Sequence, residues 1–583
     1  MSISDILVKA NSFQRAGMHA EAEQLYIEYL RQHPPHPKIL MALGYACYVQ
    51  GKIPESIDRL EQARQLTPTD PDIWFMLGTL FSRSGDSEKA LAYFQHTLVL
   101  RPLHTLARLN MGVIHFRASR YQSAIDSFTA VIESEPDNFK ALYNLGLTLI
   151  RIGRADEANT LLRRACALEP ENPAIHTCML FNLNYLAGLS AQDIFSEHRI
   201  WAVRHARPHG KNHVSTSRTS KRNIIRVGYL SPDFRNHSVF YFIHPVLRAH
   251  DRSSVEIYAY SDVPQPDEYT RRLTEAADHW RDISKMDDDA VLNRIHEDRI
   301  DILVDLAGHT ASNRMLLLSR RAAPVQVSWL GYPGTTGLDT MDFRLTDACA
   351  DPPATSQVFY TERLIYLNPV FLCYEPPADA PAPAAMPAAS NGYITFGSFN
   401  NLAKINEEVI SAWSEILRVT PRSVLLLKAP GLGDTAGRNT ILGGFRRHGI
   451  DDDRVVCIGR IESVKEHLAT YHNVDIALDT FPYNGTTTTC EALLMGVPVI
   501  TFAGTRHASR VGMSILNSVG LSSCIATSRD TYTNKAVQLA NNLDELAILR
   551  SKSRRRMFES PLTDENHFCR ELEQRYSEML STI

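Results

Sequence analysis

Cysteines are few in this sequence, and none lies in a pattern that binds metal or forms disulfides. The 583 residues include 9 cysteines, widely spaced and without a Cys-x-x-Cys pair. Such an odd, scattered set offers no zinc or disulfide framework and suits reduced thiols, so we expect a cytoplasmic protein. No apolar run reaches about 18 residues, and residues 1–13 lack the apolar core and cleavage site of a signal peptide. We therefore expect no membrane span and no membrane partner.

Positive charge is not in excess, because the formal net charge is −4. Nucleic acid is therefore not an expected partner, since phosphate backbones call for a basic surface. No Gly-x-x-x-x-Gly-Lys phosphate loop occurs, and Gly431, Gly433 and Gly437 have the wrong spacing for a dinucleotide site. The acidic runs 287–289 and 451–453 lie in polar stretches rather than at strand ends, so we expect no metal site and no cofactor.

What is present is a 34-residue repeat in three registers. Glycine recurs at Gly44, Gly78, Gly112 and Gly146, and proline at Pro34, Pro68, Pro102, Pro136 and Pro170. A small residue recurs at Ala22, Ser56, Ala90, Ala124 and Ala158, followed four positions later by Tyr26, Leu60, Phe94, Phe128 and Leu162. This period is the tetratricopeptide signature. It predicts an α-solenoid of about five helix pairs over residues 1–172, which is a binding surface rather than a catalyst.

Each predicted helix pair has a residue for a left-handed turn. Gly17, Gly51, Gly85 and Gly153 occupy this position, and Ser119 replaces glycine once. Asn110 and Asn144 share another position in consecutive units. Their amides would either hold an extended peptide by its backbone in the concave groove or be ordinary solvated helix residues.

After the repeats the pattern changes twice. Residues 173–222 are expected to form a helical cap and linker, with 209–222 as an exposed loop. From 223 onward, short β-branched runs alternate with helical segments, which predicts parallel sheets covered on both faces. The Pro/Ala-rich stretch 376–391 is interpreted as a linker between two such lobes, 223–375 and 392–583. The expected strands are 224–230, 255–260, 302–306, 325–330 and 364–367 in the first lobe, and 393–396, 424–427, 454–458, 476–478 and 497–501 in the second.

The clearest local signal is Asp479–Glu491, where a strand ends, a turn containing Gly485 follows, and a helix begins on four threonines. Free backbone N–H groups and the positive end of the helix dipole make such a point an anion site, and a diphosphate is the natural ligand. The alternative is a helix cap with redundant threonines. Four consecutive threonines are more than capping needs, so we favour the diphosphate interpretation.

Three further segments follow predicted strands. Lys404, at the end of 399–404, is placed to reach a phosphate, although most lysines are simply solvated. His237, in 231–237, is a candidate general base, with a structural or surface role as the alternative. The glycines of Gly331–Gly337 would permit close backbone approach to a ligand, although such a segment is by itself only a turn.

Together these features resemble the O-GlcNAc transferase and SPINDLY family. Gly331–Gly337, Phe399–Lys404, Asp479–Glu491 and Ala508-Ser509-Arg510-Val511 carry the resemblance, which extends over essentially the whole chain. The resemblance implies two Rossmann-like domains in a GT-B fold after the solenoid. It also implies an inverting glycosyltransferase that moves a sugar from a nucleoside diphosphate to Ser or Thr hydroxyls.

The resemblance also implies roles for individual residues. His237 matches a catalytic histidine beside the sugar, as base or acceptor-positioning group, and Lys404 matches the lysine that stabilises the leaving diphosphate. The remaining matches are substrate-binding: Gly331 and Pro333 at the sugar, Lys465 and His467 at the nucleotide base, Thr487 and Thr488 at the diphosphate, and Glu491 at the ribose.

Asn401 and Thr486 are also expected to bind substrate. At both positions the sequence departs from the animal enzyme and is closer to plant SPINDLY, which uses GDP-fucose. The expected function is transfer of GlcNAc from UDP-GlcNAc to acceptor proteins presented by the repeat groove. The alternatives are protein O-fucosylation from GDP-fucose and, in a different class, a repeat scaffold with a catalytically silent transferase domain.

Overall fold

A computed structural model describes residues 2–206 and 224–582 of the chain. The chain divides into two compact units, Met1–Thr148 and Leu149–Ile583, which are described here one at a time. The loop expected over 209–222 lies outside the described residues. Within the described ranges, no helix combines the length and apolar character needed to cross a bilayer.

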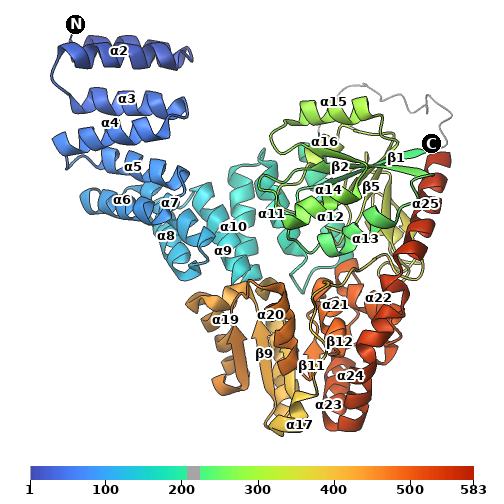
Figure 1. The fold of residues 1–583 in the computed structure, drawn as a ribbon. Coiled ribbons are helices and arrows are strands. Elements are labelled where there is room, and N and C mark those ends of the chain that lie inside the picture. Colours follow the sequence, from blue (N-terminus) through green and yellow to red (C-terminus); the bar gives the residue numbers. More distant parts are fainter. Residues whose placement is uncertain (1, 207–223, 583) are drawn as a thin grey trace. The chain divides into compact units, whose positions relative to one another are not determined.

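The first unit is a stack of antiparallel helix pairs, drawn in blue in Figure 1. Its helices are α1 (Ile3–Arg15), α2 (His19–Gln32), α3 (Pro37–Val49), α4 (Ile53–Leu66), α5 (Pro71–Arg83), α6 (Ser87–Leu100), α7 (Thr105–Arg117) and α8 (Tyr121–Ser134). The repeat registers pack against each other: a Cβ on Gly78 would lie 2.8 Å from the Phe94 ring, and one on Gly112 would lie 2.5 Å from the Phe128 ring. Glycine recurs here because the paired helices leave no room for a side chain.

The turns within the pairs have the expected left-handed backbone. Gly17, Gly51, Gly85 and Gly153 have φ between 76° and 89°, and Ser119 adopts the same region with φ 57°. α9 (Phe139–Arg151) runs across the boundary between the units, and α10 (Ala155–Leu168) belongs to the second unit. The compact first unit therefore ends earlier than the last sequence repeat, which extends to about residue 172.

The second unit contains two parallel sheets. The first has the order β3-β2-β1-β4-β5-β6-β7. Its strands are β1 (Ile225–Ser231), β2 (Val255–Ser261), β3 (His279–Asp282), β4 (Ile302–Asp305), β5 (Val325–Ser328), β6 (Phe343–Thr346) and β7 (Arg363–Tyr366). The expected strands did not include β3 and β6. Polar residues make up most of β3, and the buried Arg344 interrupts the apolar run of β6.

Helices α11 (Pro173–Leu183) and α12 (Ala191–His205) pack against loops of this first lobe. His198 Nε2 lies 2.6 Å from the Tyr332 hydroxyl, and the Arg199 guanidinium donates to the Gly337 carbonyl at 2.7 Å. The segment expected as a solenoid cap therefore also packs on the first lobe, where it covers the loops at the carboxyl ends of β4 and β5. The lobe's own helices are α13 (Phe240–Ala249), α14 (Glu268–Ala276), α15 (Asp288–Asp298) and α16 (Met315–Leu318).

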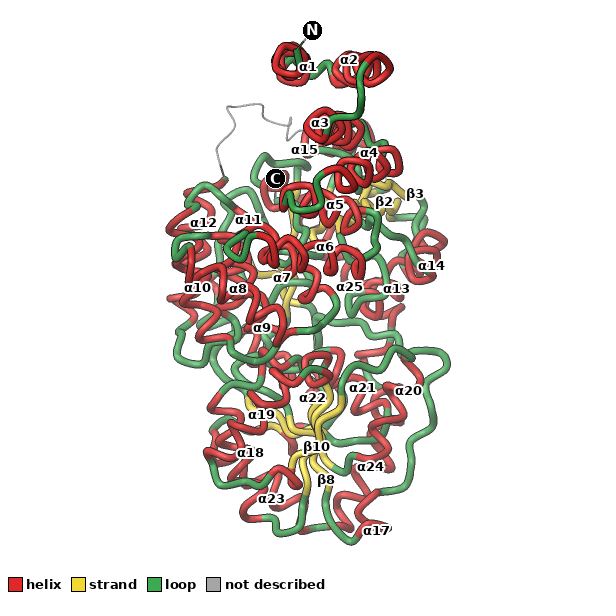
Figure 2. Tube along the Cα trace, turned by 90° about the vertical axis from the view of Figure 1, so that its left-hand side faces the viewer, coloured by secondary structure: helices red, strands yellow, loops and turns green. Residues whose placement is uncertain are grey.

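The second sheet has the order β10-β9-β8-β11-β12-β13. Its strands are β8 (Thr395–Ser398), β9 (Val424–Lys428), β10 (Val455–Ile458), β11 (Ile476–Leu478), β12 (Val499–Phe502) and β13 (Ile525–Ala526). Figure 2 shows the strands between two helical layers, with α18 (Glu407–Val419) and α23 (Arg529–Asn541) on one face, and α21 (Thr487–Leu494) and α24 (Leu543–Phe558) on the other. The sequence did not predict β13, which is only two residues long. Further helices are α19 (Thr435–Arg447), α20 (Val464–Ala469) and α22 (Val511–Ser518).

Two segments link the lobes. The stretch expected as a linker, 376–391, ends in α17 (Pro387–Asn391), where the Ala388 N–H donates to the buried Asp475 carboxylate at 3.0 Å. The last helix, α25 (Glu565–Ser581), packs on α13, and the hydroxyls of Tyr576 and Tyr229 lie 3.0 Å apart. The C-terminal helix, which the sequence places with the second lobe, therefore completes the core of the first.

Candidate active site

The loops after β8 and β11 meet because these strands are neighbours in the sheet. The Lys404 ammonium donates to the Asn484 carbonyl at 2.7 Å and lies 4.0 Å from the centre of the Tyr483 ring. The Thr488 hydroxyl donates to the Asn400 side-chain oxygen at 3.1 Å. The structure thus brings Lys404 together with the segment that precedes the threonine run.

The buried Asp479 carboxylate shapes the start of α21. It accepts hydrogen bonds from the Gly485 N–H at 2.7 Å and from the Thr501 hydroxyl at 2.7 Å. A Cβ on Gly485 would lie 2.3 Å from the Thr488 hydroxyl, so a larger residue here would displace that hydroxyl from its hydrogen bond with Asn400. The Gly485 N–H is therefore held by Asp479 and is not one of the groups free to bind a ligand.

The backbone N–H groups that remain free to bind a ligand lie in the first turn of α21. Thr486 occupies the position before α21, and its side chain makes no capping hydrogen bond. The first helical bond runs from the Cys490 N–H to the Thr486 carbonyl, and the N–H groups of Thr487–Thr489 meet no acceptor in the described part of the chain. These groups, with the dipole of an eight-residue helix behind them, have the arrangement that binds anions at helix starts.

Burial shifts two ionisable groups at this site in opposite directions. It lowers the pKa of the Lys404 ammonium to about 8, against the attraction of the Asp479 carboxylate. It raises the pKa of Asp479 to about 6, although three hydrogen bonds and Lys404 oppose the shift. Lys404 is therefore a cation at neutral pH, and its charge is poorly solvated. A phosphate that binds next to such a poorly solvated ammonium interacts with it strongly, because little water screens the two charges.

His467 and Glu491, expected at the nucleotide base and ribose, contact each other. His467 Nε2 lies 3.0 Å from a Glu491 oxygen, and His467 Nδ1 lies 2.5 Å from the Lys428 ammonium. Because a lysine can only donate, this contact makes Nδ1 the acceptor and places the His467 proton on Nε2. Burial lowers the pKa of Lys428, with Glu491 opposing the shift.

Lys428 was not among the residues singled out from the sequence. The available signal was a lysine at the end of the buried strand Val424–Lys428. Lys465, two residues before His467 on α20, is exposed and has no partner among the described residues. Residues two apart lie on roughly opposite sides of a helix, so Lys465 does not join the cluster of His467, Glu491 and Lys428.

In the first lobe, His237 follows β1 and its side chain is 40% exposed. Its Nδ1 accepts a hydrogen bond from the Val239 N–H at 3.3 Å and lies 3.8 Å from an Asp233 oxygen. Burial lowers the pKa of His237, with Asp233 opposing and Arg235 adding to the shift. The neutral ring with Nδ1 as acceptor carries its proton on Nε2. This tautomer can donate a hydrogen bond to an acceptor hydroxyl but cannot take its proton at Nε2.

The glycine loop has a packing function in the structure. A Cβ on Gly331 would lie 2.0 Å from the Leu306 carbonyl oxygen, and one on Gly337, whose φ is 75°, would lie 2.6 Å from the His198 carbonyl oxygen. Pro333 lines a pocket that also includes Arg506 and His507. The Asn401 side-chain oxygen accepts from the Ala403 N–H at 3.2 Å, so it holds the turn that presents Lys404.

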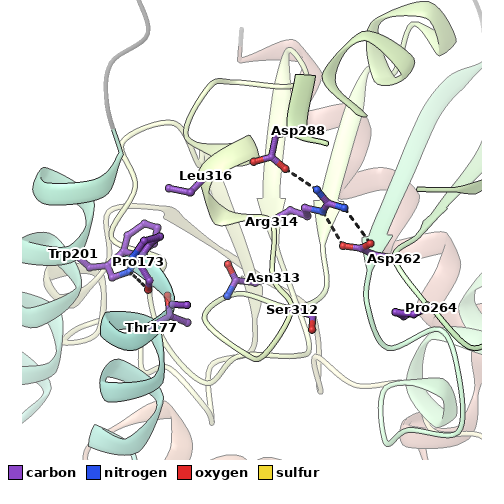
Figure 3. A pocket seen from close by; sticks show the side chains of 11 residues that line it. Pro173, Thr177, Trp201, Asp262, Pro264, Asp288, Ser312, Asn313, Arg314 and Leu316 are labelled. Atoms are coloured by element: carbon purple, nitrogen blue, oxygen red, sulfur yellow. Dashed lines mark hydrogen bonds and ion pairs between the residues drawn. The ribbon is translucent and has the colours of Figure 1, made fainter. Parts of the chain in front are cut away.

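A separate pocket lies at the carboxyl ends of β2 and β4 and is shown in Figure 3. Arg314 binds both oxygens of Asp262, at 2.7 Å and 3.1 Å, and also an oxygen of Asp288 at 2.8 Å. Trp201 and Thr177, from α12 and α11, line the opposite side of this pocket. Asp288 is thus paired with an arginine, and Asp287 caps α15, so this acidic run serves local structure.

Comparisons with known proteins agree with this architecture. Tetratricopeptide repeat profiles match residues 44–85, 75–134 and 115–173, and the glycosyl transferase family 41 profile matches 173–375 and 385–572. A solved O-GlcNAc transferase mutant from Thermobaculum terrenum superposes with a TM-score of 0.81 at 33% identity, covering 88% of this chain and 97% of that one. The expected fold, an α-solenoid followed by a GT-B region of two Rossmann-like domains, is confirmed.

Curated relatives include proteins named "probable UDP-N-acetylglucosamine--peptide N-acetylglucosaminyltransferase SPINDLY". The one from Petunia hybrida is 40% identical over 417 residues, which are 71% of this chain and 44% of the relative. The one from Arabidopsis thaliana is 40% identical over 416 residues, 71% of this chain and 45% of the relative. The chain thus spans less than half the length of these relatives. On the match of the family profile to both lobes, the chain belongs to glycosyl transferase family 41.

Proposed function

We propose that this chain is an inverting, metal-independent protein O-glycosyltransferase that moves a sugar from a nucleoside diphosphate to Ser or Thr hydroxyls. The observation that carries the proposal is the position of Lys404 at the start of α21, where the Thr487–Thr489 N–H groups are unpaired. A lysine charge and a helix start converging on one point suit a diphosphate better than any neutral ligand.

In the proposed reaction the acceptor oxygen attacks the anomeric carbon from the side opposite the nucleotide. Negative charge then grows on the leaving diphosphate, where Lys404 and the helix start stabilise it. His237 donates its Nε2 proton in a hydrogen bond that positions the acceptor oxygen. As the new bond to the anomeric carbon forms and the bond to the diphosphate breaks, the acceptor hydroxyl releases its own proton to solvent, and the diphosphate leaves as the anion. The Nε2-protonated tautomer supports this positioning role over that of general base.

The proposed donor is UDP-GlcNAc, with GDP-fucose as the alternative. The SPINDLY relatives carry the UDP-N-acetylglucosamine activity in their names. Asn401 and Thr486, where the sequence is closer to plant SPINDLY than to the animal enzyme, are the residues that support the GDP-fucose alternative, and they lie in the loops after β8 and β11 that meet at Lys404. We place the base and ribose near the paired His467 and Glu491, with Lys428 fixing the orientation of the histidine.

Purified full-length protein incubated with either radiolabelled donor and a Ser/Thr peptide library tests the proposal. We expect transfer from one donor, with the other at least about tenfold slower in kcat/KM. Isothermal titration with each nucleoside diphosphate runs in parallel. Binding of a nucleoside diphosphate without transfer or hydrolysis from either donor would favour the alternative of a silent scaffold, and absence of both would refute the proposal.

A further inference from the structure

A buried arginine with no counter-ion among the described residues lines a pocket formed by α12 and the loops after β5 and β12. Arg506 is 8% exposed, and its guanidinium makes one hydrogen bond, from Nη2 to the Leu186 carbonyl at 3.1 Å. Its Nη1 is buried and meets no acceptor, and across the described residues no carboxylate forms an ion pair with it. Leaving a buried charge unpaired costs stability, so an anionic ligand would relieve a penalty already built into the fold.

The other charges around this pocket already cancel one another. Asp351 accepts hydrogen bonds from His507 Nδ1 at 2.7 Å, from the Thr346 hydroxyl at 2.6 Å and from the Tyr360 hydroxyl at 2.8 Å. The Arg344 guanidinium lies 3.5 Å from His507 Nε2, on the far side of the same ring. Asp351 and Arg344 therefore balance each other across His507. Among these groups, only the positive charge of Arg506 has no opposite charge that balances it.

The remaining walls of the pocket restrict what can enter. Ile194 and Phe195 of α12, Pro333 from the loop after β5, and Phe359 form the apolar part of the lining. Its neutral polar part comes from Asn184, Thr335, Ser356 and Thr505. A small site whose one uncompensated charge is a planar guanidinium suits a carboxylate, which an arginine fork binds through two hydrogen bonds. A fully charged phosphate would place two negative charges against one cation and lose more hydration.

Two hydrogen bonds connect the loop that carries Arg506 to Lys404. The Ala508 carbonyl, two residues after Arg506, accepts from the Asn484 N–H at 2.8 Å, and the Asn484 carbonyl accepts from Lys404. Arg506 therefore belongs to a loop that is held directly against the loop preceding α21, where the leaving group is proposed to bind. The diphosphate is already matched by Lys404 and α21, and the proposed sugars are neutral, so the acceptor is the reactant left to supply a carboxylate.

We propose that the Arg506 pocket binds an Asp or Glu side chain of the acceptor protein close to the hydroxyl that is modified. This proposal rests on the proposed function, and it adds an acceptor preference that the family assignment does not contain. An acidic residue at one fixed distance from the Ser or Thr would then favour transfer.

The test uses full-length protein and pairs of accepted peptides that differ by Asp or Asn at each position around one hydroxyl. For the wild type we expect the acidic peptide to have a kcat/KM about tenfold or more above its amide partner at one position. In Arg506→Met this ratio should fall to about twofold or less, and Arg506→Lys should retain an intermediate ratio because it keeps the charge without the fork.

Arg529→Met is the matched control, because Arg529 is an exposed arginine of the same lobe outside the pocket. It should leave the ratio unchanged, which excludes a general effect of lost positive charge. Melting curves with each peptide give a readout independent of transfer, and the acidic peptide should stabilise the wild type more than its amide partner does.

Equal ratios in the wild type and in Arg506→Met would overturn the inference, whether or not transfer occurs. Stabilisation by sodium acetate at matched ionic strength, combined with no preference for acidic peptides, would also overturn it by assigning the pocket to a free carboxylate. If no peptide accepts sugar from either donor, the proposed function fails. The melting curves then decide separately whether an acidic peptide binds through Arg506.

Discussion

The ammonium of Lys404 donates a 2.7 Å hydrogen bond to the carbonyl of Asn484, a residue 80 positions further along the chain. This contact joins the loop after β8 to the loop after β11, and it sets a positive charge beside the unpaired N–H groups of α21. The site depends on β8 and β11 being neighbours, because only then do their carboxyl ends open at the same point.

Lys404→Ala is expected to abolish transfer while leaving the fold intact. The ammonium would no longer offset charge on the leaving group, a loss on the order of 3 kcal/mol or about a hundredfold in kcat. Lys552→Ala, at an exposed lysine on α24, is the control and should behave as the wild type. Near-normal turnover of Lys404→Ala, with an unchanged melting temperature, would refute the role.

The activity should fall at alkaline pH because Lys404 must be charged. Burial lowers its pKa to about 8, so above that pH the free enzyme loses the ammonium and kcat/KM for the donor drops about tenfold per pH unit. In Lys404→Arg the guanidinium stays protonated, and the alkaline decline should disappear even though the rate is lower. A wild-type profile that stays flat to about pH 9.5 would contradict this assignment.

Gly331→Ala should destabilise the protein, whereas Gly334→Ala should not. The new Cβ at Gly331 would lie 2.0 Å from the Leu306 carbonyl oxygen, which is backbone and cannot rotate away. We expect a loss of about 1–3 kcal/mol, measured by denaturant unfolding. At Gly334 the nearest atom is 3.7 Å away, so the change should stay within about 0.5 kcal/mol. Equal stability of the two variants would show that the loop relaxes freely.

Transfer is expected to proceed fully in EDTA. Lys404 and the start of α21 supply the positive charge that a divalent ion would otherwise provide at a diphosphate. The acidic runs are engaged elsewhere, as in the ion pairs of Asp288 with Arg314 and of Asp452 with Arg446. Rates with chelator and with added Mg²⁺ or Mn²⁺ should agree within about twofold. A tenfold gain on adding metal would reveal a ligand site.

Removing residues 1–138 should impair transfer to proteins but not donor hydrolysis. The deletion keeps α9 whole and spares α11 and α12, which pack on the first lobe through Tyr332 and Gly337. A cut near residue 209, where the sequence alone suggests a boundary, would strip these two helices from the lobe. Equal rates on protein substrates for the shortened and full-length chains would rule out a presenting role for the repeats.

The sequence by itself determined the repeat architecture, because its contacts are local. Gly78 meets Phe94 and Gly112 meets Phe128 at a constant separation of 16 positions, so the 34-residue period records the packing directly. The threonine run after β11 was readable for the same reason, since a strand end, a turn and a helix start are adjacent in the chain. Most strands also followed from apolar runs, whereas β6 did not because Arg344 interrupts its run.

Only the tertiary structure decided which distant groups meet. Lys428 was not predicted because its contact with His467 spans 39 positions, and Lys465 remained outside the cluster because helix geometry turns it away. The environment of Arg506 depends on the connection between α11 and α12, on α12 and on two strand-end loops that close around it, and on His507 forming a hydrogen bond with Asp351. Sequence patterns report whether a residue is buried and in which kind of element. Strand order and lobe packing decide its partners, because those contacts form between segments that no local pattern connects.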